Sequence, residues 1–301
     1  MLASLFSFIF SVSFLFSSSF AEAASTKERI IWYKPNWPPY FETSGPRAGQ
    51  GYIDKLLDYL QSQMPDTQFE SLYYSLNSLA QMRKQSPYTC NVSHLRTPER
   101  EKYAYFTAFY IQPPPQLVFR TEDFKNKMFE AKVVSLARLL DQKDLRAGLS
   151  ADRSYGSTLD AIIKTHKNKS NVETLQGIPD SSSTLNMLSA KRFDYAIEYE
   201  EVARYLQSNK LVIGNFSFAE IEEQRGLVVV HIACSKTDWG LKTISRLDSI
   251  LRRISGTPKY KELMESWHSE ALLKSYRKEF DEFYQRRSSE TWTNAPSLHK
   301  D

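Results

Sequence analysis

The chain has 301 residues, of which 41% are hydrophobic and 13% aromatic, so it can bury the core of one or two domains and is not expected to be disordered. Its net charge of +4 is a mild excess that does not require a nucleic-acid partner, and the basic run 164–169 is typical of a solvated loop. Two cysteines, with no histidine or cysteine at ligand spacing, are too few for a structural zinc site, so no metal is expected.

Residues 1–23 are predicted to form a cleavable signal peptide. Leu, Phe, Ile and Ser dominate the first twenty residues, and Ala21-Glu22-Ala23 offers an A-x-A cleavage site. An uncleaved membrane anchor is the alternative, because the apolar run is nearly long enough to span a bilayer and lacks the usual Lys or Arg before it. Cleavage is favoured because serines interrupt the run and small residues follow it.

Cys90 and Cys234 both remain after signal removal. In an oxidising compartment this makes one long-range disulfide plausible, and two separate buried thiols are the alternative.

Short β-rich and helical segments alternate from residue 29 onward. Strands are expected at 29–34, 68–74 and 89–93, with an amphipathic helix around the apolar positions 53, 56, 57 and 60 and a short helix at 76–84. The proline-rich loop 35–41 ends the first strand. This alternation predicts a parallel or mixed sheet covered by helices.

The pattern restarts near residue 116 and predicts a second α/β unit. Strands are expected at 117–120, 147–150, 172–175 and 193–197, with helices over 155–166 and from 181 onward. The apolar run 227–233 is expected to be a central strand or a second crossover between the units. Helical stripes follow at 244–254 and 260–267, then a charged helix to about 287 and a frayed end.

The segment LRTPEREK, residues 95–102, precedes an aromatic run and the triple proline 113–115. A turn leading into a proline-stiffened crossover could hold one guanidinium still, as recognition of a buried carboxylate requires. Arg100 is a candidate for that group, which would mean capture of a small molecule between two lobes. The residues alone favour the alternative for Arg100, a surface ion pair with Glu99 or Glu101, which would contribute little.

Taken together, the chain resembles the bacterial extracellular solute-binding proteins of family 3 from about residue 30 to 267. The resemblance is carried by PPYF at 38–41, TPER at 97–100, YFT at 105–107, FDYA at 193–196 and the closing segment 260–267. The cysteine pair looks like a poorly characterised branch of that family.

The resemblance implies an α/β fold of the type II periplasmic binding protein class, with two lobes that are each a mixed sheet flanked by helices. Lobe 1 would comprise 25–112 and 232–270, and lobe 2 would comprise 113–231. Hinge crossovers are expected at 110–118 and 225–234, and residues 271–301 would form a C-terminal helix and flexible tail. A bridge between Cys90 and Cys234 would fasten the second crossover to lobe 1.

In lobe 1, the resemblance implies that Arg100 grips the carboxylate of an amino-acid ligand. Trp37, Tyr40 and Phe41 follow the first strand, where an open α/β sheet presents ligands, and are candidates for an aromatic wall. Packing beneath the loop is the alternative for these rings.

In lobe 2, Ser154 and Tyr155 precede a helix whose N-terminal amides attract anions, although N-capping by Ser154 explains the pattern equally well. Many family members carry an Asp for the ligand's ammonium group where this chain has Tyr199. Glu198 and Glu200 flank that position and are candidates to replace the missing acid.

We therefore expect a monomeric periplasmic solute-binding protein that needs no cofactor. It would capture a small, polar, carboxylate-bearing solute of the amino-acid type and pass it to an ABC permease or a membrane sensor. The alternatives are an enzyme on the same scaffold, similar to the cyclohexadienyl dehydratases, with Glu198, Glu200 or His94 as acid or base, and a sensory protein that has lost solute binding.

Overall fold

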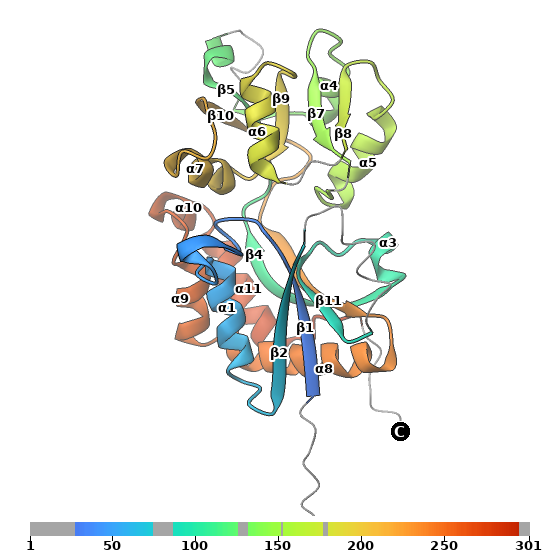
Figure 1. Ribbon diagram of the computed structural model, residues 1–301, viewed down its shortest axis with the longest axis vertical. Helices are drawn as coiled ribbons and strands as arrows, with labels where there is room; N and C mark the ends of the chain where they lie inside the picture. The colour runs from blue at the N-terminus through green and yellow to red at the C-terminus, as the bar shows by residue number, and fades with distance from the viewer. Residues whose placement is uncertain (1–27, 75–86, 126–131, 152, 177–179, 295–301) are drawn as a thin grey trace, which may run out of the picture.

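The computed structural model describes residues 28–74, 87–125, 132–151, 153–176 and 180–294. Within these residues the chain forms two lobes, each built on its own β-sheet, and two crossovers join them near the middle of the molecule (Figure 1). The predicted two-lobe α/β architecture is therefore confirmed. The predicted signal peptide and the predicted helix at 76–84 lie outside the described residues.

The sheet of lobe 1 has the strand order β2-β1-β3-β11-β4. β1 is parallel to both β2 and β3, whereas β11 lies antiparallel between β3 and β4. The apolar run 227–233 is therefore a central strand of lobe 1, one of the two predicted options. The strands are β1 (Glu28–Pro35), β2 (Thr67–Tyr74), β3 (Thr89–His94), β4 (Ala104–Gln112) and β11 (Val228–Ser235).

Helices cover this sheet and pack on it through the apolar faces that the sequence predicts. In α1, residues Ile53, Leu56, Leu57 and Leu60 are all buried against the core. The helical elements of lobe 1 are η1 (Gly45–Arg47), α1 (Tyr52–Gln61), α3 (Pro98–Glu101), α8 (Asp238–Ile254), α9 (Pro258–Glu265), α10 (Glu270–Ser275) and α11 (Arg277–Ser289).

The C-terminal segment contacts lobe 1 as far as the structure describes it. The main-chain carbonyl of Trp292 accepts a hydrogen bond from the amide of Ala108 at 3.2 Å, and Thr293 forms an antiparallel bridge with Thr107 in β4. Residues 290–294, which lie in the segment expected to be a flexible tail, thus lie along the edge of the sheet.

The sheet of lobe 2 has the strand order β6-β10-β5-β9-β7-β8. Its strands are β5 (Gln116–Arg120), β6 (Val133–Val134), β7 (Ala147–Ser150), β8 (Val172–Leu175), β9 (Tyr195–Glu198) and β10 (Phe216–Ile221). Its helices are η3 (Thr121–Lys125), α4 (Leu136–Leu140), α5 (Ser157–His166), α6 (Ser181–Ser189) and α7 (Glu200–Ser208). β10 and α7 are not among the elements predicted from the sequence.

The two crossovers are short. The first runs from β4 to β5 through Pro113, Pro114 and Pro115, and the second runs through residues 222–227 from β10 to β11. Because β11 pairs within the sheet of lobe 1 from Val228 onward, lobe 1 resumes a few residues before the predicted boundary at 232.

Cys90 and Cys234 form a disulfide, as predicted. They lie directly opposite each other in the antiparallel pair of β3 and β11, with 4.0 Å between their Cα atoms. Because 144 positions separate them in sequence, the bond fastens the strand that returns from lobe 2 to the first part of the chain.

The main hydrophobic core fills lobe 1 and continues into α6, α7 and β9 of lobe 2, while a second core lies between α4, α5 and the lobe 2 sheet. Among the described helices, none combines the length and apolar character needed to cross a membrane.

Candidate functional site

The loop after β1 is held in place at the upper edge of lobe 1. Asp54 accepts hydrogen bonds from the amides of Glu42 at 3.0 Å and Gly51 at 3.2 Å, and its other oxygen lies 3.1 Å from Lys34 Nζ. A Cβ atom at Gly51 would lie 2.4 Å from the carbonyl oxygen of Tyr40, so only glycine allows this close approach. The loop is thereby fixed against the N-terminus of α1.

Two of the three predicted aromatic residues reach the junction between the lobes. Trp37 and Tyr40 stack with 4.5 Å between ring centroids, and Trp37 meets Tyr199 of lobe 2 edge-on at 5.3 Å. Phe41 is fully buried in the main hydrophobic core. Burial raises the pKa of Tyr199 to about 12, so its hydroxyl stays protonated at neutral pH.

Polar contacts join α7 of lobe 2 directly to lobe 1. Glu201 accepts a hydrogen bond from the Tyr40 hydroxyl at 3.2 Å, and its other oxygen lies 2.6 Å from His268 Nδ1. Tyr205, one turn later, donates its hydroxyl proton to Glu42. The described lobes are therefore in contact on the α7 side, which Figure 1 shows directly above α1 and α10.

A guanidinium lies beside these rings. The two terminal nitrogens of Arg153 donate to Glu198 at 2.8 and 2.7 Å, and the two side chains are 14% and 1% exposed. The Arg153 guanidinium carbon lies 5.5, 5.2 and 5.3 Å from the ring centroids of Trp37, Tyr155 and Tyr199. Burial alone would lower the pKa of Arg153, but the charge and hydrogen bonds of Glu198 raise it overall.

Ser154 and Tyr155, the residues predicted to bind an anion before α5, both contact the carboxylate of Asp160. Asp160 accepts hydrogen bonds from the Ser154 hydroxyl at 2.5 Å and from the Tyr155 amide at 2.8 Å. The Tyr155 hydroxyl in turn accepts from the Ser150 amide at 3.1 Å. Ser154 and Tyr155 thus fix the loop between β7 and α5, and the Tyr155 ring contributes one face to the Arg153 environment.

Glu198 and Glu200 have different surroundings. Glu198 is buried against Arg153, whereas Glu200 forms an ion pair with Arg204 one turn further along α7, and its side chain is 35% exposed. Of the two predicted acids, only Glu198 lies at the ring cluster of the junction.

Arg100 lies in α3, whose N-terminus is capped by Thr97. Its guanidinium donates to the main-chain carbonyl of Leu95 at 2.9 Å and is partly buried. The pKa of Glu99 is lowered chiefly by a main-chain hydrogen bond, and Lys164 of α5 contributes to the shift. In Figure 1, α3 lies on the same side of the molecule as α5 and below it.

The sequence did not single out Arg153, Glu201, Tyr205 or His268 as site residues. Residues 200–208 carry a helical apolar pattern at Val202, Ala203 and Leu206, which could have revealed α7 and its inward acid. For the other residues the sequence carries no comparable signal, because their contacts join segments distant in the chain.

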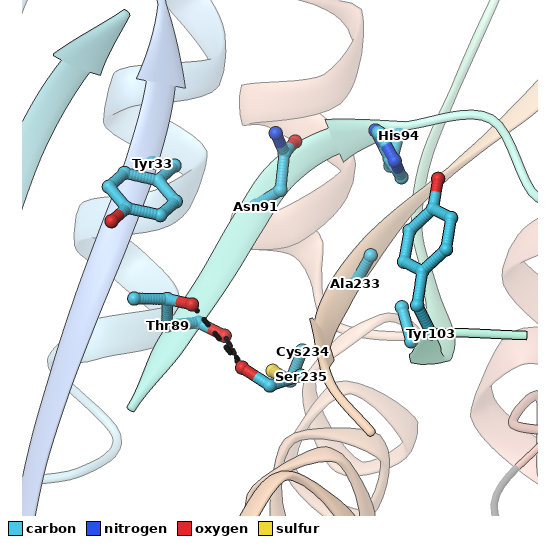
Figure 2. A pocket seen from close by; sticks show the side chains of 9 residues that line it. Tyr33, Thr89, Asn91, His94, Tyr103, Ala233, Cys234 and Ser235 are labelled. Atoms are coloured by element: carbon cyan, nitrogen blue, oxygen red, sulfur yellow. Dashed lines mark hydrogen bonds between the residues drawn. The ribbon is translucent and has the colours of Figure 1, made fainter. Parts of the chain in front are cut away.

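Figure 2 shows a separate pocket of about 90 Å³ whose lining comes from lobe 1 alone. Thr89 and Ser235 lie at one end, where their hydroxyls are 3.3 Å apart. His94, the histidine considered for the enzymatic alternative, stacks on Phe106 at 6.0 Å and lines the other end. The remaining lining residues are Tyr33, Asn91, Tyr103, Ala104, Ala233 and Cys234.

No protein family model matches the sequence, and no curated protein matches it. Many solved structures share the fold. A histidine kinase sensor domain with similarity to periplasmic binding proteins is 16% identical, with a TM-score of 0.62, and the match covers 80% of this chain and 96% of that one. A proposed L-cystine ABC transporter from Listeria monocytogenes is 18% identical, with a TM-score of 0.60 and coverage of 80% and 95%.

An arginine periplasmic binding protein from Legionella pneumophila is 14% identical, with a TM-score of 0.58 and coverage of 80% and 100%. At these identities the likeness establishes the fold. The chain therefore has the two-lobe type II periplasmic binding protein fold, as predicted from the sequence.

Proposed function

We propose that the protein is a periplasmic solute-binding protein, related to family 3, that captures a small carboxylate-bearing solute between its lobes for an ABC permease or a membrane sensor. The observation that carries the proposal is the convergence of aromatic and charged side chains from both lobes at one junction. Trp37 and Tyr40 come from lobe 1, and Arg153, Tyr199 and Glu201 come from lobe 2.

This arrangement suits a receptor that works by lobe closure. Contacts such as Tyr40 to Glu201 and Trp37 to Tyr199 join the two lobes, so they exist only when the lobes are together. A solute that binds groups of both lobes stabilises that closed form, and the change in shape can be read by a membrane partner.

Arg100 is the proposed carboxylate ligand. It lies in α3 and is partly buried, and one of its terminal nitrogens donates to the Leu95 carbonyl, which orients the guanidinium plane. A guanidinium held in this way can give a carboxylate paired, charge-assisted hydrogen bonds.

The test is thermal unfolding of the mature protein with a panel of amino acids and their deaminated analogues. A bound solute raises Tm by an amount that grows with the logarithm of its concentration relative to Kd. We expect Arg100→Ala to leave the Tm of the solute-free protein nearly unchanged and to weaken solute binding at least tenfold.

Arg96→Ala is the matched control, because Arg96 lies in the same segment but forms an exposed ion pair with Glu101. It should retain the affinity of the parent protein. Undiminished binding by Arg100→Ala would overturn the proposed carboxylate role, and a complete absence of stabilisation by any solute of the panel would argue against a receptor.

A further inference from the structure

Arg153 fills a site that has the chemistry of a pocket for an organic cation. Its guanidinium is bound by both oxygens of Glu198 and lies within 5.5 Å of three aromatic ring centroids. Aromatic faces and a buried carboxylate are the two features that proteins combine to hold guanidinium and ammonium groups.

The walls of this site are fixed independently of Arg153. Glu198 Oε1 also accepts a hydrogen bond from the Tyr199 amide at 2.8 Å, which orients the carboxylate from its own strand end. Tyr155 is held by the Ser150 amide and by Asp160, and Trp37 by stacking on Tyr40. The carboxylate and rings would therefore keep their places if another cation replaced the arginine side chain.

Arg153 itself lies on a connection rather than within a helix or strand. The loop joins β7 to α5 and passes through Gly156, whose φ of +103° is a conformation that glycine adopts readily. Trp37 belongs to lobe 1, whereas the other three walls belong to lobe 2, so the cation lies where the lobes meet. A long arginine side chain on such a loop can leave the site by rotation about its own bonds.

We propose that Glu198, Trp37, Tyr155 and Tyr199 form a binding site for the guanidinium or ammonium group of a solute, and that Arg153 occupies this site as a tethered competitor when no solute is bound. The inference rests on the proposed function and deepens it, because it makes the solute a cationic one whose carboxylate would be bound by Arg100. With a tethered competitor, the apparent Kd equals the intrinsic Kd divided by the fraction of molecules in which the site is vacant.

The experiment compares L-arginine with L-citrulline, which has the same shape and the same amino-acid end but an uncharged side chain. Binding of each to the parent protein and to Arg153→Ala is measured by titration calorimetry. We expect Arg153→Ala to bind L-arginine at least about tenfold more tightly than the parent protein does, because the competitor is gone. L-Citrulline should show no such gain.

Arg192→Ala serves as the matched control, since Arg192 is an exposed arginine of the same lobe that pairs with Glu173. It should bind L-arginine as the parent protein does. Arg153→Ala leaves Glu198 buried without a cation, so thermal unfolding with guanidinium chloride at low millimolar concentration provides a second readout. The guanidinium ion should raise the Tm of Arg153→Ala and should not raise that of the double variant Arg153→Ala/Glu198→Gln.

The possible results separate this inference from the proposed function. If carboxylate solutes bind in a manner that depends on Arg100 while Arg153→Ala shows no gain for L-arginine and no response to guanidinium, the cation site is wrong and the receptor stands. If guanidinium stabilises only Arg153→Ala but no carboxylate solute binds any variant, the cation site stands and the receptor fails. Equal gains for L-arginine and L-citrulline would also overturn the cation site.

Discussion

Each lobe contains a buried arginine that donates to main-chain carbonyls. The two arginines differ in how exposed their acid partners are. In lobe 1, Arg287 is fully buried, donates to the Ala108 carbonyl at 2.9 Å and lies 3.0 Å from Asp248, whose side chain is only 6% exposed. In lobe 2, Arg120 donates to the carbonyls of Leu188 and Phe193, each at 2.7 Å.

The acid partners of Arg120 are more accessible. Asp123 and Asp194 are 21% and 23% exposed, so water can solvate their charges if the arginine is lost. At Arg287 both members of the ion pair are buried, whereas at Arg120 mainly the cation is buried. The comparison teaches that the cost of losing a buried charge depends on whether its partner can reach water.

The largest effect is expected for Arg287→Met. This change leaves Asp248 as a buried carboxylate with hydrogen bonds from Thr107 and the Trp292 amide but no cation. Breaking such a pair costs about 3–5 kcal/mol of unfolding free energy. The measurement is urea unfolding followed by circular dichroism.

The same measurement on Arg120→Met sharpens the comparison, with an expected loss of about 1–3 kcal/mol from two unsatisfied carbonyls. Arg286→Ala, which removes an exposed pair with Glu290, should change stability by less than about 1 kcal/mol. If Arg120→Met and Arg287→Met lower the free energy of unfolding equally, the exposure of the acid partner does not determine the cost.

Removal of the disulfide is the next largest expected change. The double variant Cys90→Ala/Cys234→Ala frees a covalent loop closed over 144 positions, and loss of such a bond costs about 2–5 kcal/mol. Reduction of the parent protein should produce a loss of similar size, and reductant should have no effect on the double variant. If the reduced and oxidised parent proteins were equally stable, the packing of β11 alone would hold the strand in place and the disulfide would not contribute to stability.

A smaller effect concerns the response of lobe 1 to acid. Burial, followed by the charges of Arg96 and Arg287, lowers the pKa of His231 to about 4. The unfolded chain then binds more protons than the folded protein between about pH 6.5 and 4, so stability falls as the pH is lowered through that window. The full shift corresponds to at most about 3 kcal/mol.

His231→Gln should flatten this part of the stability profile while leaving the acid response below pH 4 unaltered. Unfolding free energies measured at half-unit pH intervals would reveal the change in slope. An unchanged slope in the variant would mean that other groups produce the acid sensitivity.

The fold could be predicted from the sequence because its periodic patterns are local. The apolar positions of α1 and the short strands β7 and β8 can each be recognised from ten residues or fewer. β10 was missed because its six residues, FSFAEI, alternate only weakly. α7 was missed because Tyr199 and its flanking acids were interpreted as ligand groups rather than as the start of a helix.

The site was only partly predictable. Trp37 and Tyr40 were predicted because ligands of an open α/β sheet bind at the loops that follow its strands, and both residues lie where the lobes meet. The ion pair of Arg153 with Glu198 joins positions 45 residues apart, and the bond of Tyr40 with Glu201 joins positions 161 apart. Such pairings depend on how the lobes meet, which no local pattern encodes.

The placement of β11 has a consequence for how the chain is made. β11 is inserted between β3 and β4, yet it is synthesised after every strand of lobe 2. A nascent or truncated chain that ends before residue 228 therefore exposes two bare strand edges in its first half, where foreign strands can add. The sheet of lobe 1 can therefore close these edges only after the chain has been made as far as β11, and not when its first lobe segment is complete.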